Sequence, residues 1–180
     1  MEMNPIMADD TIADIISEKT ALEFPDWFKK YIQNPANNIT CLYLKALASG
    51  PIRRCTAFSS YIVNGLRFNS CAGDTSKSTS NSGVWVKGAD LGGEAHDFYG
   101  KLKRIIRLEY PDIPLKRTIM FEVHWYDPTP EGTRVNDEYE MVDINHKKKY
   151  RKYGPFILAT QALQVVYLEY PSLKKSKGDW

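Results

Sequence analysis

The residue pattern best suited to binding chemistry is a basic run in the last third of the chain. A tyrosine stands among lysines and an arginine there, in the order Lys147, Lys148, Lys149, Tyr150, Arg151 and Lys152. Lysine and arginine can neutralise phosphate groups, and a tyrosine ring can stack on a base. The run therefore predicts a contact with nucleic acid or another partner, or a nuclear localisation signal. A solvated loop is the competing interpretation, since runs of like charge usually stay in water.

A second candidate site consists of four aromatic residues, Trp85, Tyr99, Trp125 and Tyr126. If their rings gather on one surface, they form a cage of the kind that binds a cationic group such as methyl-lysine through cation–π interactions. Trp125, however, shares its side of an extended segment with Phe121 and Val123, which favours packing in the core. The pattern leaves both interpretations open and favours the core.

Residue patterns typical of enzymes and metal sites do not occur in the sequence. The histidines and cysteines are well separated; they are His96, His124, His146, Cys41, Cys55 and Cys71. None of them forms an HExxH or CxxC motif, and no GxSxG motif is present. Gly100-Lys101 is not the end of a phosphate-binding loop, because Leu102 stands where serine or threonine must hold magnesium. We therefore expect no metal, no cofactor and no enzymatic activity.

Composition indicates one globular domain with a buried core. The chain has 180 residues, of which 43% are hydrophobic and 12% aromatic, and its formal net charge is +2. A net charge this small does not by itself indicate a nucleic-acid partner. No apolar run approaches the roughly 20 residues of a membrane span, and the start of the chain lacks the features of a signal peptide. We expect an intracellular protein, nuclear or cytoplasmic, that does not bind membranes.

The clearest structural element is a strand over residues 118–127. Ile119, Phe121, Val123 and Trp125 fall on one side of an extended chain, and polar or mixed residues fall on the other. Asp127-Pro128 then ends the segment with turn chemistry. This strand should anchor the fold.

Further strands are predicted on both sides of it. Residues 55–63 and 66–69 flank Asn64-Gly65, a type I′ turn signal, and predict a hairpin. Residues 98–110 fit a strand or a helix, and the neighbouring glycine and proline favour the strand. Shorter strands are expected at 84–86, 140–144, 156–159 and 164–169, with a polar surface loop over residues 69–82.

The first fifty residues have helical spacing. We expect a short helix from Asp10 or Thr11, a second beginning at Pro25, and a third over residues 39–47 that ends at Gly50-Pro51. The predicted organisation is an N-terminal extension over residues 1–23, a single domain over 24–171 and a disordered basic tail over 172–180. The predicted fold class is α+β: a curled antiparallel sheet, or a small barrel of the SH3 or bromo-adjacent-homology (BAH) kind, with the N-terminal helices packed against it.

Seven short motifs, in order, resemble a known family. They are Phe24-Pro25-x-Trp27-Phe28-Lys29, Leu47-Ala48-x-Gly50-Pro51, Tyr61-Ile62-Val63-Asn64-Gly65-x-Arg67-Phe68, Asn81-Ser82-Gly83-Val84, Phe98-Tyr99-Gly100-x-Leu102-x-x-Ile105-Ile106-x-Leu108-x-Tyr110, Phe121-x-x-x-Trp125-Tyr126-Asp127 and Pro155-Phe156-Ile157-Leu158-Ala159-x-Gln161-Ala162-x-Gln164-Val165-x-Tyr167. In spacing they resemble the plant domain-of-unknown-function family 4216, which is associated with transposase proteins of CACTA (En/Spm-like) transposons. The resemblance extends over about residues 24–171.

The resemblance implies a plant origin and a transposon context, but no reaction. This chain departs from the family pattern at several polar positions, because Val123-His124 replaces Cys-Asp and Asn69-Ser70 replaces His-Thr. Taken with the basic run, it implies a non-enzymatic binding module that acts through protein contacts, with DNA or chromatin as a further partner. The alternative is a purely protein-binding or self-associating module that uses an exposed sheet edge or apolar patch and binds no nucleic acid.

Overall fold

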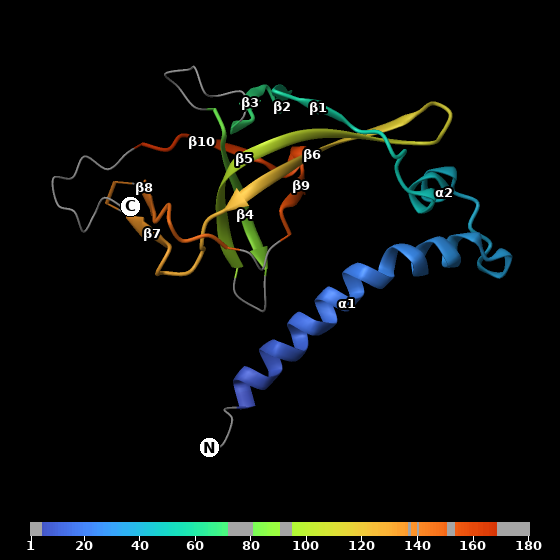
Figure 1. Ribbon diagram of the computed structural model, residues 1–180, viewed down its shortest axis with the longest axis horizontal. Helices are drawn as coiled ribbons and strands as arrows, with labels where there is room; N and C mark the ends of the chain where they lie inside the picture. Colours follow the sequence, from blue (N-terminus) through green and yellow to red (C-terminus); the bar gives the residue numbers. More distant parts are fainter. Residues whose placement is uncertain are drawn as a thin grey trace. The chain divides into compact units, whose positions relative to one another are not determined.

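The computed structural model describes residues 5–71, 81–90, 95–136, 138–139, 141–150 and 154–168. The chain falls into two compact units (Figure 1). Unit 1 consists of residues 1–53 and 109–116, and unit 2 consists of residues 54–108 and 117–180. The N-terminal helices and the main sheet thus belong to different units, and each unit is described by itself.

Unit 1 contains α1 (Pro5–Gln33), the short 3₁₀ helix η1 (Pro35–Asn37) and α2 (Leu42–Ser49). The prediction of two separate helices before residue 34 is wrong, because α1 continues through Pro25. Proline removes one backbone donor, but helix-forming residues on both sides of it keep the chain helical here. The predicted boundary between residues 23 and 24 therefore falls inside α1. The third predicted helix is confirmed as α2, which ends at Gly50 with a φ of 78°.

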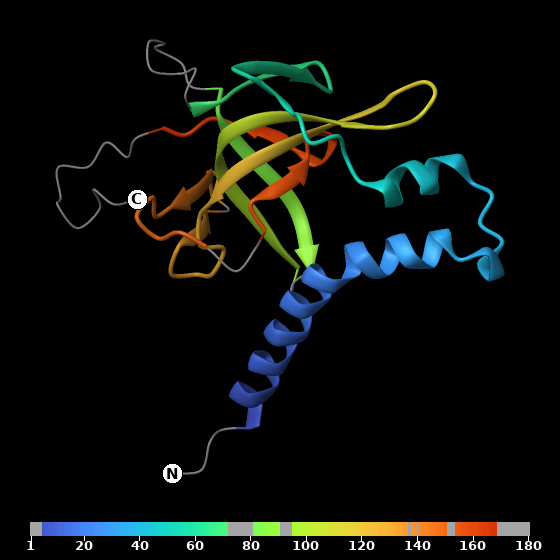
Figure 2. The ribbon, with the colours of Figure 1, turned by 45° about the vertical axis from the view of Figure 1, so that its right-hand side comes forward.

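Unit 2 is built from antiparallel strands. They are β1 (Thr56–Phe58), β2 (Ser60–Val63), β3 (Leu66–Asn69), β4 (Gly83–Asp90), β5 (Ala95–Tyr110), β6 (Lys116–Trp125), β7 (Thr133–Asn136), β8 (Met141–Ile144), β9 (Phe156–Leu158) and β10 (Leu163–Val165). The ends of β5 and β6 that face their connecting turn belong to unit 1. The main sheet has the order β10-β4-β5-β6-β9, and β1 also pairs with β5. Figure 2 shows β5 and β6 side by side as a long curved pair.

The α+β class is confirmed, but the barrel is not. The strands that the structure describes form one six-stranded and two two-stranded sheets, and none of these closes on itself. β9 and β10 pair over only three residues each, so the two edges of the main sheet are held by short strands. The prediction of an SH3-like or BAH-like barrel thus finds no support in the observed strand order.

Residues 98–110 are confirmed as a strand. The alternation of buried and exposed side chains is interrupted within β5, because Leu102 and Ile105 lie three positions apart and are both fully buried. Lys103 and Arg104, which separate them, are both exposed. This interruption explains why the spacing also fits a helix, in which residues three apart share a face.

The predicted hairpin is confirmed as β2 and β3. Asn64 and Gly65 have φ values of 52° and 79°, the two left-handed positions that a type I′ turn requires. The strand predicted over residues 55–63 is interrupted, since β1 pairs with β5 while β2 pairs with β3. β7, which pairs with β8, was not predicted.

The core of unit 2 lies on one face of the main sheet. Phe121, Val123 and Trp125 of β6 are at most 2% exposed, as the alternation in the sequence predicts. The ring of Phe68 from the β2–β3 hairpin contacts that of Phe121 at a centroid distance of 5.1 Å. The other buried core residues include Val63, Val84, Val86, Phe98, Leu102, Ile105, Ile157, Ala159 and Ala162.

Several predicted segments lie partly or wholly outside the described residues. These are the tail at 172–180, positions 72–80 of the predicted loop, Glu140 at the start of the strand that the structure describes as β8, and Glu169 at the end of the strand predicted over residues 164–169. Within the described ranges, no helix has both the length and the apolar character that a membrane span needs.

Candidate functional site

An aromatic layer covers the face of the main sheet opposite the core. Trp85 and Tyr99 are directly paired across β4 and β5, and their rings stack at 6.1 Å with an interplanar angle of 3°. Tyr126 follows β6 and Tyr167 follows β10, and their rings meet edge to face at 5.6 Å. Tyr167 Oη donates a hydrogen bond of 3.0 Å to the carbonyl of Gly100. We call Trp85, Tyr99, Tyr126 and Tyr167 the outer aromatic layer.

Two lysines lie over this layer. Lys149 Nζ is 4.0 Å from the centroid of the Tyr126 ring, and Lys101 Nζ is 5.9 Å from the centroid of the Tyr167 ring. Lys149 is positioned by a backbone bridge to Tyr126, and Lys101 by its place on β5. Neither ammonium group forms an ion pair with a described residue. We call Lys101, Lys149, Tyr126 and Tyr167 the two-lysine site.

The electrostatics of the two-lysine site follow from its partial burial. Burial lowers the pKa of Lys149, the positive charge of Lys101 lowers it further, and Cys71 acts in the opposite direction. Burial, with a smaller contribution from Cys71, raises the pKa of Tyr126 to about 12. Burial also raises the pKa of Tyr167. The tyrosines are therefore neutral at physiological pH, and the two lysines repel one another.

The structure separates the members of the predicted basic run. Lys148 forms an ion pair of 2.5 Å with Glu131. The Tyr150 ring packs against Phe98 at 5.8 Å, at the margin of the core, and is thus not presented for stacking on a base. Lys147 is exposed, and its backbone N–H donates to the Asn145 side chain.

Of the described members of the run, only Lys149 enters the two-lysine site. Arg151 and Lys152 lie outside the described residues.

The predicted aromatic cage is also divided. Trp125 is 2% exposed, its Nε1 donates to the carbonyl of Gly154 at 3.1 Å, and its ring meets the edge of Phe98 in the core. A ligand cannot reach it, because a strand directs successive side chains to opposite faces and Trp125 points to the core face. Trp85, Tyr99 and Tyr126 lie together in the outer aromatic layer.

Sequence reasoning missed two members of the two-lysine site. From the sequence, Lys101 was considered only as part of a phosphate-binding loop, and that interpretation was rejected. Alternation along β5, however, puts Lys101 on the same face as Tyr99. Tyr167 lies beyond the last described strand, and nothing local to it indicates that it packs on Tyr126. The order of the strands, which the sequence does not reveal, brings these residues together.

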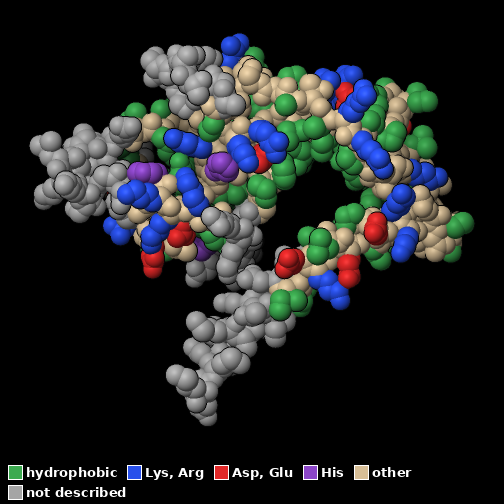
Figure 3. Space-filling view, in the orientation of Figure 1, with side chains coloured by type: hydrophobic (Ala, Val, Ile, Leu, Met, Phe, Trp, Pro, Cys, Tyr) green, Lys and Arg blue, Asp and Glu red, His purple; other side chains and the backbone are tan. Residues whose placement is uncertain are grey.

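A second charged cluster of unit 2 consists of one carboxylate that is bonded to two cations. Glu122 of β6, whose side chain is 8% exposed, accepts a hydrogen bond of 2.8 Å from Lys103 and a second hydrogen bond from Arg104. Burial raises the pKa of Glu122, but these hydrogen bonds and the positive charges of both donors lower it more, so the net pKa lies below its ordinary value. Figure 3 shows lysine, arginine and histidine side chains grouped over the strands of unit 2. Lys103 and Arg104 therefore each form an ion pair with Glu122, whereas Lys101 and Lys149 form none with a described residue.

We expect Glu122→Gln to lower the free energy of unfolding by about 1 kcal/mol at pH 7, because a neutral amide replaces a carboxylate bonded to two cations. The folded-state pKa of Glu122 is depressed, so its contribution is present above the unfolded-state pKa and is lost as the pH falls through the folded-state value. The difference between the two proteins should therefore shrink below about pH 4.5. Urea unfolding at pH 7 and at pH 3 measures it.

Glu131→Gln is the matched control for Glu122→Gln. It removes an exposed ion pair, since the Glu131 side chain is 77% exposed, and should change stability by less than about 0.5 kcal/mol. Equal effects of the two substitutions at pH 7 would contradict a special role for Glu122.

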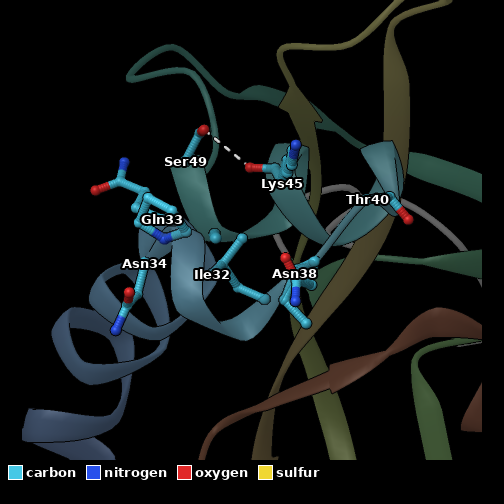
Figure 4. Close-up of a pocket in the computed structure, with 10 residues that line it drawn as sticks. Ile32, Gln33, Asn34, Asn38, Thr40, Lys45 and Ser49 are labelled. Atoms are coloured by element: carbon cyan, nitrogen blue, oxygen red, sulfur yellow. Dashed lines mark hydrogen bonds between the residues drawn. The ribbon is translucent and has the colours of Figure 1, made fainter.

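Unit 1 contains an open pocket of about 520 Å³ between the end of α1 and α2. Its lining mixes amide and hydroxyl side chains with apolar ones such as Ile32 and Ile39. Figure 4 shows that Ser49 Oγ donates to the carbonyl of Lys45. Lys45 is the titratable residue in its lining, so no acid–base pair converges there. Across the described ranges, no group of three or more histidine, cysteine or acidic residues is arranged to hold a metal ion.

Comparison with known families supports the sequence resemblance over part of the chain. Residues 106–180 match the family model of DUF4216, a domain of unknown function. The DUF4216 match covers Tyr126, Lys149 and Tyr167 of the two-lysine site, while Lys101 lies before it. Neither curated proteins nor solved structures gave a match.

Proposed function

We propose that this chain is a non-enzymatic binding module that acts through protein contacts, with DNA or chromatin as a further partner. The observation that carries this proposal is the two-lysine site, in which two ammonium groups from different parts of unit 2 lie over tyrosine rings without a described carboxylate partner. A positive surface of this kind attracts an acidic group on a partner.

Origin and location are part of the same proposal. The DUF4216 match supports the domain family. The motif resemblance supports derivation from a plant CACTA-type transposon protein. A location in the nucleus or cytoplasm is proposed from the sequence, in which no membrane span or signal peptide is recognised.

An electrophoretic shift assay with duplex DNA at two salt concentrations tests the nucleic-acid version. Lys101→Glu/Lys149→Glu should abolish the shift of the unmodified chain, and raising the salt should weaken it steeply, because phosphate contacts release counterions. The control is Lys29→Glu/Lys45→Glu, which makes the same charge change at two exposed positions of unit 1 and should retain binding. Absence of a shift by the unmodified chain, or equal shifts by both double variants, would remove this version.

Protein contacts need a separate measurement. The unmodified chain and both double variants are used as baits, and captured proteins are compared by mass spectrometry. We expect partners that the unmodified chain and the unit 1 control retain and that Lys101→Glu/Lys149→Glu loses. Partner sets that do not differ among the three baits would contradict a role for the site.

Exposed apolar residues on α1 favour a second candidate, a self-associating module. Leu22, Trp27 and Tyr31 are 74%, 55% and 42% exposed, and the rings of Trp27 and Tyr31 stack at 5.2 Å. Exposed apolar surface of this kind is typical of protein interfaces. Light scattering over a range of concentrations tests it, and a mass that stays that of a monomer would count against it.

A further inference from the structure

We propose that the two-lysine site binds the phosphate group of a phosphorylated side chain on a protein partner. This inference rests on the proposed function and deepens it, because it names the chemical group that Lys101 and Lys149 recognise. Both lysines are exposed, and each lies over one of two tyrosine rings that meet edge to face. We place the phosphate between these two ammonium groups.

The charge of the site matches a dianion better than a single carboxylate. The two ammonium groups lie over the Tyr126 and Tyr167 rings, which contact each other. Burial lowers the pKa of Lys149, and the positive charge of Lys101 lowers it further, so the site favours a ligand of opposite charge. A carboxylate supplies one negative charge, whereas a phosphate monoester supplies about −1.5 to −2 at pH 7 and three acceptor oxygens. A phosphate monoester can therefore accept hydrogen bonds from both lysines at once.

The residues around the site favour binding of a single phosphate group over binding along a nucleic-acid backbone. Binding along a nucleic-acid backbone requires a series of available cations, and single-stranded binding also uses exposed rings. Among the described cations of unit 2, Lys103 is engaged by Glu122 and Lys148 by Glu131. Tyr126, the ring beneath Lys149, is 3% exposed, so it forms the floor of the site and cannot stack on a base. A single phosphate on a protein fits these limits.

Inorganic phosphate is the first probe. The full chain is labelled with ¹³C-lysine and titrated with phosphate at constant ionic strength and pH 7, and the lysine ε resonances are recorded by NMR. We expect saturable shifts of the Lys101 and Lys149 signals, which the variants Lys101→Gln and Lys149→Gln assign. Lys45 is the internal control and should not respond. No saturable shift, or shifts spread evenly over the lysines, would overturn the proposal.

Peptides and DNA then distinguish the source of the phosphate. A phosphoserine peptide, a phosphotyrosine peptide, their unphosphorylated forms and a DNA duplex are compared in the same titration. We expect at least one phosphopeptide to bind about tenfold more tightly than its unphosphorylated form, and Lys101→Gln/Lys149→Gln to remove that difference. Equal binding of all peptides would refute the inference, as would tighter binding of the duplex.

The double variant must remain folded for this comparison. Its near-ultraviolet circular dichroism should equal that of the unmodified chain, because neither lysine has an ion pair with a described residue to lose. If phosphate does not bind while Lys101→Glu/Lys149→Glu still loses captured partners, the phosphate inference is wrong and the proposed function stands. If neither effect appears, both are wrong.

Discussion

Phe121→Ala should lower the free energy of unfolding of unit 2 by about 3–5 kcal/mol, because it removes a fully buried ring from the centre of the core. The Phe121 ring contacts Phe68 at a centroid distance of 5.1 Å, so the substitution also removes a ring contact between the β2–β3 hairpin and β6. Urea unfolding followed by tryptophan fluorescence measures the loss, since Trp85 and Trp125 both belong to unit 2.

Phe156→Ala is the matched control for Phe121→Ala. Phe156 lies on β9, directly paired with Glu122 and therefore next to Phe121, but its side chain is 48% exposed. We expect the control to cost much less than Phe121→Ala, since about half of the Phe156 side chain stays in contact with water and its loss leaves no enclosed cavity. A loss of similar size for both phenylalanines would mean that the core is not on the face of the sheet described above.

Gly83→Ala should lower the free energy of unfolding by about 3 kcal/mol, through overpacking against backbone. A Cβ atom at Gly83 would lie 2.0 Å from the carbonyl oxygen of Val165, its paired residue on β10. Backbone cannot rotate away as the end of a side chain can, so β10 must move. Urea unfolding measures the stability.

The same substitution should also disturb the two-lysine site. Tyr167 follows β10 by two residues and is held by its hydrogen bond to Gly100. Displacement of β10 should therefore loosen Tyr167, and with it the ring under Lys101, so that phosphate binding weakens. Gly154→Ala is the control, since a Cβ there meets no atom within 4 Å. Unchanged stability of Gly83→Ala would contradict the close approach of β10.

Local sequence patterns correctly predicted those elements that depend only on neighbouring residues. The alternation over residues 118–125 predicted both the strand β6 and its buried face, because the period of a strand is two residues. Asn64-Gly65 predicted the hairpin turn because both positions need positive φ. Pro25 led to a wrong prediction of a helix start at residue 25. Its preference for the first helical position was weaker than the helical tendency of the residues around it.

The candidate site could be predicted only in fragments. The basic run contributed Lys149 and the aromatic set contributed Tyr126, as parts of two different hypotheses. The 4.0 Å contact between them exists because the segment after β8 returns to the end of β6 through a single backbone bridge. Lys101 joins them from a neighbouring strand. The number of residues between two positions in the sequence does not predict whether their side chains make such a contact.

The sequence by itself determined the α+β class, the central strands, the hairpin and the face of β6 that is buried, because each depends on the types and spacing of neighbouring residues. Only the tertiary structure decided which charges remain without a carboxylate partner among the described residues. Glu122 pairs with both Lys103 and Arg104, and Glu131 pairs with Lys148, across separations of 17 to 19 residues. Coulomb interactions depend on distance in space, and the order of strands in the sheet sets that distance.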